Sequence, residues 1–100
     1  MYREGQGVHQ NYKSAVKWYR LASEQGGADA QYSLGFMYRE GKGVIQDNIY
    51  AHMWYSIAAS SGKQNAVTNR HIVAKRMTPA DIFTAQKLAR ECVRKKYKGC

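Results

Sequence analysis

The chain has 100 residues, of which 44% are hydrophobic, and it carries a formal net charge of +9 at pH 7. This length predicts one domain, and the apolar content excludes a chain that stays disordered because it cannot build a core. The sequence contains no run of 18 apolar residues, so we expect no membrane-spanning helix.

An internal repeat with a period of 36 residues is the main feature of the sequence. Residues 1–8 read MYREGQGV and residues 37–44 read MYREGKGV. The match continues in register through Ala15 and Ala51, Trp18 and Trp54, Tyr19 and Tyr55, Ala22 and Ala58, and Gly26 and Gly62. A period of this length is typical of helical repeat arrays. We therefore predict an all-α fold, an α/α superhelix of antiparallel helix pairs with about five helices.

Residues 1–27 form only part of a repeat. Met1 aligns with Met37, which falls near the end of a helix in the second copy, so the first copy lacks its leading helix. We expect a chain that was cut from a longer array or is completed by a partner molecule, and the sequence contains no signal peptide. The apolar face of the helix that carries Trp18 would have no partner on its leading side, which predicts a homodimer through this open N-terminal edge.

Residues 28–62 form one full repeat of two helices. Ala30, Leu34 and Tyr38 make one helical stripe, and Gly35 beside them predicts close approach of another helix. Gly41 is expected to stop the first helix, and Asp47 to cap the second. The second helix has apolar residues at helical spacing, Ala51, Trp54, Tyr55 and Ala58, and Gly62 ends it.

Residues 63–100 depart from the repeat and are predicted to form a helix pair that caps the array. Arg70 and His71 stand where the pattern has Leu34 and Gly35. Thr78 followed by Pro79 predicts a helix start, and we expect the last helix to run from Pro79 to about Tyr97. Its expected core stripe is Ile82, Ala85, Ala89, Cys92 and Val93. This part also holds most of the excess positive charge, with nine Lys/Arg against two Asp/Glu after residue 63.

About a dozen positions of this pattern resemble the Sel-one-like repeat (SLR) family of tetratricopeptide-like solenoids. They are Ala30, Leu34, Gly35, Tyr38, Gly41, Gly43, Val44, Asp47, Ala51, Trp54, Tyr55, Ala58 and Gly62. The resemblance covers roughly residues 1–70 and implies a helical superhelix that acts as an adaptor in protein assemblies, chiefly in bacteria. One cysteine-rich branch of the family is linked to weak penicillin binding and β-lactamase activity, but this chain lacks the paired cysteines within its repeats.

Motifs that could carry chemistry are incomplete. Ser14-Ala15-Val16-Lys17 and Ser60-Ser61-Gly62-Lys63 match the Ser-x-x-Lys string of penicillin-recognising enzymes, but the other two motifs of those enzymes are absent. His9, His52 and His71 lack the spacing of a helical metal site. We therefore expect no enzyme, no metal and no cofactor. Cys92 is expected to be a buried thiol and Cys100 an exposed free one.

Two surfaces are candidate binding sites. In tetratricopeptide-like arrays the first helix of each pair lines the concave side, which here predicts a protein- or peptide-binding surface made of Asp29, Tyr32, Phe36, Arg39, Thr68, Ile72 and Lys75. Exposed aromatic residues beside Arg are typical of interface anchors. The last helix carries a basic stripe made of Lys87, Arg90, Arg94 and Lys98. This stripe favours an alternative function, which is binding of an anionic surface or of nucleic acid, and nucleic acid is the less expected partner.

Overall fold

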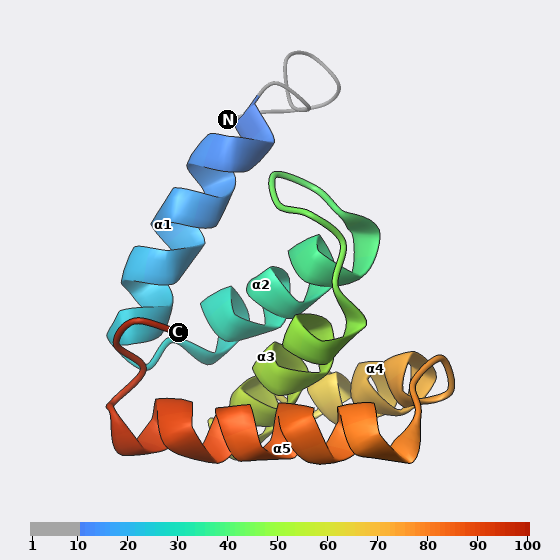
Figure 1. Cartoon of the computed structure of the whole chain (residues 1–100). Coiled ribbons are helices and arrows are strands. Elements are labelled where there is room, and N and C mark those ends of the chain that lie inside the picture. Colours follow the sequence, from blue (N-terminus) through green and yellow to red (C-terminus); the bar gives the residue numbers. More distant parts are fainter. Residues whose placement is uncertain (1–10) are drawn as a thin grey trace.

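The computed structural model describes residues 11–100 of the chain, and they form five helices and no strand. The helices are α1 (Tyr12–Glu24), α2 (Ala28–Glu40), α3 (Asn48–Ser60), α4 (Asn65–Ala74) and α5 (Pro79–Arg94). Figure 1 shows α2 and α3 in the middle, α1 and α4 on either side of them, and α5 along one edge. The all-α prediction with about five helices is confirmed.

The helix boundaries follow local sequence signals. Gly41 adopts a left-handed φ of 71° after α2, and its N–H donates a 2.8 Å hydrogen bond to the carbonyl oxygen of Met37. The Asp47 carboxylate accepts from the Tyr50 N–H at the start of α3, and the Thr78 hydroxyl accepts from the Asp81 N–H at the start of α5. These caps satisfy backbone donors that have no partner inside a helix.

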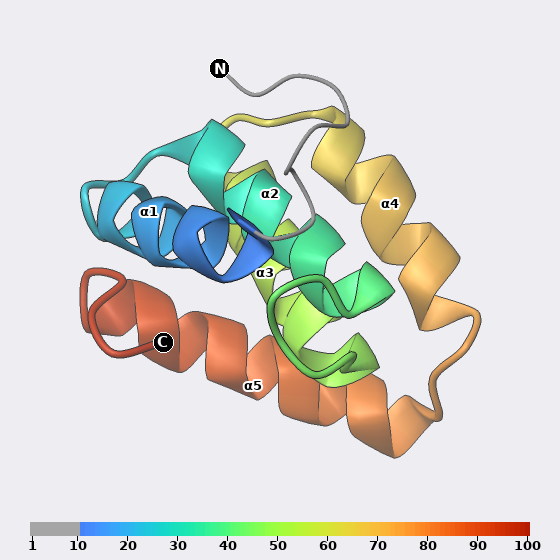
Figure 2. The same ribbon diagram turned by 90° about the horizontal axis from the view of Figure 1, so that it is seen from above.

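The α3 helix is the centre of the fold, because it packs on α2, α4 and α5. Its Ala51, Trp54, Tyr55 and Ala58 side chains, the apolar face that the sequence predicts, are all buried. Trp54 belongs to a cluster with Leu34 of α2 and residues of α5, whereas Tyr55 packs with Ala66 and Val73 of α4. The α2, α4 and α5 helices therefore surround α3, whereas α1 packs on α2 (Figure 2).

The last two helices, α4 and α5, are arranged differently from the pair formed by α2 and α3. The α4 helix packs on α3, and α5 turns away from α4 to lie along α3 as well. Ala85, Ala89 and Cys92 of α5 are buried as expected, but Val93 is exposed and does not belong to the core stripe. The helix also ends at Arg94 and not near Tyr97, because Lys96 and Tyr97 take left-handed φ values of 57° and 68° that stop the helix.

The two cysteines form a disulfide, so the prediction of two free thiols is wrong. The left-handed turn after α5 reverses the chain and places the Cα atoms of Cys92 and Cys100 5.8 Å apart, which is a normal distance for a bridge. The Tyr97 ring then lies beside Gly26, next to the corner between α1 and α2. The tail therefore connects α5 with the first repeat (Figure 1).

We predict that Gly35→Ala destabilises the protein. A Cβ at position 35 would lie 2.7 Å from the buried Tyr55 ring, and overpacking of this kind costs about 1–3 kcal/mol. The higher helix propensity of Ala relative to Gly offsets only about 1 kcal/mol of this loss in stability. Urea unfolding monitored by circular dichroism measures the difference, with Ser33→Ala on the same helix as the control.

A double-mutant cycle identifies the cause of that loss. In a Tyr55→Leu background the close contact is gone, so Gly35→Ala should then be neutral or stabilising. An equal loss in both backgrounds would contradict the role of the Gly35–Tyr55 contact.

Candidate functional site

The predicted binding surface lies on α2 and α4, which flank α3, and we call it the α2–α4 surface. Its residues are the seven from the sequence analysis, Asp29, Tyr32, Phe36, Arg39, Thr68, Ile72 and Lys75, together with Asn69 and Lys63. The α2 and α4 helices pack on α3 and make little backbone contact with one another. Side chains therefore carry the link between them.

Asn69 of α4 joins the two helices. Its Nδ2 donates to the Tyr32 hydroxyl at 3.0 Å, and its Oδ1 accepts from an Arg39 guanidinium nitrogen at 3.0 Å. One amide thus holds two side chains that lie two turns apart on α2. The Arg39 guanidinium carbon also lies 5.3 Å from the centre of the Phe36 ring, at cation–π distance.

Asp29 lies at the other end of α2 and pairs with Lys63. The Lys63 ammonium is 2.8 Å from the Asp29 carboxylate and 5.5 Å from the centre of the Tyr32 ring. The hydrogen bond to Asp29 raises the pKa of Lys63. A raised pKa is the opposite of what a lysine general base requires, and no hydrogen bond joins Lys63 to Ser60 or Lys17 to Ser14.

The structure connects some of the predicted residues and leaves others apart. Tyr32, Phe36 and Arg39 are linked through Asn69 and the cation–π contact, and Asp29 reaches Tyr32 through Lys63. Thr68 and Ile72 of α4 are exposed, and so is Lys75, which follows the helix. Sequence reasoning missed Asn69 of α4 and Lys63 of the connection before it, because a single polar residue carries no signal of its partner.

Two buried titratable groups lie behind this surface on α3. Burial raises the pKa of Tyr55 to about 12, an effect that Arg39 partly offsets, and its ring lies 5.5 Å from that of Tyr32. Burial, as the largest cause, and the positive charges of Arg70 and His71 on α4 together lower the pKa of His52 to about 4. Neither the Tyr55 hydroxyl nor the His52 Nδ1 has a hydrogen-bond partner among residues 11–100. Both groups are therefore neutral at pH 7.

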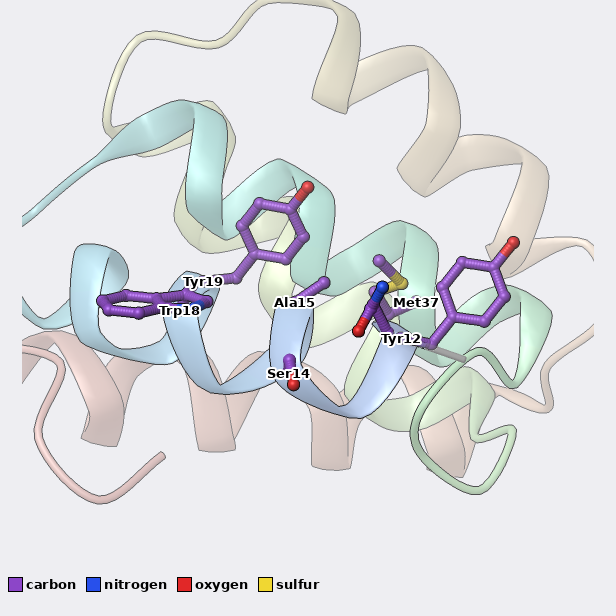
Figure 3. Close-up of a pocket in the computed structure, with 7 residues that line it drawn as sticks. Tyr12, Ser14, Ala15, Trp18, Tyr19 and Met37 are labelled. Carbon is purple, nitrogen blue, oxygen red and sulfur yellow. The ribbon is translucent and has the colours of Figure 1, made fainter. Parts of the chain in front are cut away.

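A second candidate site is an apolar groove of about 420 Å³ at the edge formed by α1, and we call it the α1 edge. It is lined by Asn11, Tyr12, Ser14, Ala15, Trp18, Tyr19 and Met37. Figure 3 shows that the labelled side chains come from α1, except Met37 from α2. Trp18 is 69% exposed, whereas its counterpart Trp54 is 1% exposed, so the same face is covered in one repeat and open in the other.

Only part of the predicted basic stripe lies on the α5 helix. Lys87, Arg90 and Arg94 are exposed on α5, but Lys98 follows the left-handed turn and does not continue the helical spacing. The structure adds two neighbours in the tail, Lys95 and Lys96. None of these six cations forms an ion pair within residues 11–100.

Residues 11–100 contain no group of three or more His, Cys, Asp or Glu side chains that could hold a metal ion. His9 lies outside the described residues. Within the same range, no helix is both long and apolar enough to cross a bilayer.

The 36-residue period and the arrangement of helices around α3 define a tetratricopeptide-like helical repeat protein. The family model of the Sel1 repeat matches residues 1–27 and 28–63, which together are more than half of the chain. The chain therefore belongs to the Sel1 repeat family, whose repeats are generally protein-interaction modules. No curated protein matches the chain.

We predict that the stability of the protein falls as the pH drops from about 6.5 towards 4. The unfolded chain binds a proton at His52 near its ordinary pKa of 6.5, whereas the folded chain binds it only near 4. The contribution of His52 to the free energy of unfolding is therefore fully present above pH 6.5 and falls on acidification. At pH 5 the free energy of unfolding is lower by about 2 kcal/mol. Urea unfolding at several pH values measures this loss.

His52→Gln should flatten the pH dependence between pH 7 and 5, because no proton is then taken up on unfolding at that position. His71→Gln is the matched control, since His71 is exposed, and it should keep most of the slope. A wild-type slope that survives in His52→Gln would show that another group causes it.

Proposed function

We propose that this protein is a non-enzymatic adaptor that binds a peptide segment of a partner protein on the α2–α4 surface. The main support is that each of the two helices exposes an apolar side chain on this surface, Phe36 at 38% and Ile72 at 41%. Exposed aromatic side chains next to Arg are frequent anchors of protein interfaces.

Preorganisation supports the same surface. Asn69 holds Tyr32 and Arg39 in place before any partner arrives, and Arg39 in turn lies against Phe36. Side chains that are already ordered lose less conformational entropy on binding. Arg39 pairs with Glu40 and Lys63 with Asp29, which leaves Lys75 as a cation of this surface without an ion pair inside residues 11–100. The preferred peptide therefore combines an apolar residue with an acidic one.

We predict that Phe36→Ala/Ile72→Ala reduces binding of peptides selected from a random display library by about tenfold or more. Both side chains are exposed, so the fold should survive, and circular dichroism checks this. Ile45→Ala/Phe83→Ala is the matched control, because it removes one exposed aliphatic and one exposed aromatic side chain elsewhere. Calorimetry with the selected peptides measures affinity.

Equal losses in the two double variants would contradict a specific site on the α2–α4 surface. A selection that yields no peptide dependent on Phe36 and Ile72 would do the same. In either case the α2–α4 surface would not be the binding site.

We also propose that the α1 edge pairs with the α1 edge of a second copy. Trp18 and Leu21 are exposed there, and they continue the apolar groove that Ala15 and Met37 line. A second copy carries an identical edge, so two copies related by a two-fold axis can cover each other. Such a contact removes a large exposed apolar area from water.

Trp18→Gln/Leu21→Gln should convert a dimer into a monomer. Light scattering across a dilution series measures the mass, and the unmodified protein should show twice the monomer mass at high concentration. Ile45→Gln/Val93→Gln removes two exposed apolar side chains elsewhere and should leave the dimer intact. A monomeric wild-type protein at all concentrations would disprove this self-association.

A further inference from the structure

The outer side of α5 combines unpaired positive charge with an exposed apolar end. Lys87, Arg90 and Arg94 follow Phe83 at spacings of four, three and four residues, which keeps all four on one side of the helix. Phe83 is 62% exposed, and the three cations are exposed and form no ion pair within the described part of the chain. We call these four residues, with Lys95, Lys96 and Lys98, the α5 face.

The core does not need the α5 face. The helix already buries Ala85, Ala89 and Cys92, and it packs on α3, whereas Phe83, Lys87, Arg90 and Arg94 are exposed. Phe83 gains nothing from exposure to water, and a row of like charges repels itself. Intramolecular packing therefore leaves the position of Phe83 and the row of cations unexplained.

The shape of the α5 face suits a flat partner. The helix has 16 residues, which corresponds to about 24 Å, and it lies along one edge of the molecule in both views (Figures 1 and 2). A straight edge of this length can lie on a plane. The exposed residues Pro79 and Ala80 lie in the turn before Phe83, and Asp81 is the one charged residue of this turn. The end of the helix at Phe83 therefore carries no positive charge, and the other end is cationic.

We propose that the α5 face docks on the surface of a bilayer that contains anionic lipids. The cations pair with headgroup phosphates, and Phe83 enters the boundary between headgroups and acyl chains. The row offers long flexible cations, which suit headgroups that move laterally. Phe83 is exposed beside the row and has no partner on the phosphate backbone of a duplex, whereas a bilayer can take up its ring, so a bilayer fits better than a duplex nucleic acid.

Binding to vesicles tests the proposal. Sedimentation with vesicles of phosphatidylcholine should give little binding, whereas vesicles that contain about one third phosphatidylglycerol should bind the protein at low salt. Each cation near an anionic surface contributes about fivefold to binding, so Arg90→Gln/Arg94→Gln should lower the partition coefficient by roughly 25-fold. The double variant should also reduce the salt dependence.

The matched control is Lys13→Gln/Lys17→Gln, which removes the same charge from exposed positions on α1. It should lower binding far less, because those positions lie on a different helix. Phe83→Ser should weaken binding several-fold at every salt concentration, since an apolar contact is not screened by ions. Circular dichroism confirms that each variant is folded.

Several results would overturn the proposal. Equal binding to vesicles with and without phosphatidylglycerol would exclude recognition of anionic lipid. Equal losses in the α5 and α1 variants would show that net charge alone attracts the protein. Binding of duplex DNA or RNA that depends on Arg90 and Arg94, without vesicle binding, would assign the α5 face to nucleic acid.

Discussion

The close approach of α2 to α3 is the contact on which the rest of the structure depends. The absence of a side chain at Gly35 lets the Tyr55 ring pack directly on the α2 backbone. The Tyr55 ring then packs against Tyr32 of α2 and against Ala66 and Val73 of α4. A larger residue at position 35 would move α2 away from α3, and the spacing of α2 and α4 would change with it.

The same helix pair explains why the α2–α4 surface is ordered. Two helices that rest on α3 are held at a distance that one Asn side chain can bridge, and Asn69 fills that position. Burial keeps Tyr55 and His52 neutral behind the surface, so its charge comes from Arg39, Lys63 and Lys75 together with the acidic partners Glu40 and Asp29. The core thus sets both the geometry and the charge of the proposed peptide site.

The α1 edge and the α5 side of the molecule differ in chemistry. The α1 edge carries the apolar face that the second repeat buries, and it leaves Trp18 exposed. On the other side α5 lies along α3, and the disulfide between Cys92 and Cys100 holds the tail beside the α1–α2 corner. The first surface is therefore apolar, and the second is cationic.

The repeat in the sequence determined the helical class and the positions of α2 and α3, because Gly and apolar residues at a fixed period leave few alternatives. The caps at Asp47 and Thr78 were also readable, since they depend on residues close in the chain. The close approach at Gly35 was readable because a Gly inside a helix costs stability that only a tight contact explains. Only the tertiary structure decided the course of α5, the disulfide, and the joining of Tyr32 to Arg39 by Asn69. These features depend on which distant residues the packing brings together, and a spacing pattern in one sequence carries no record of such distances.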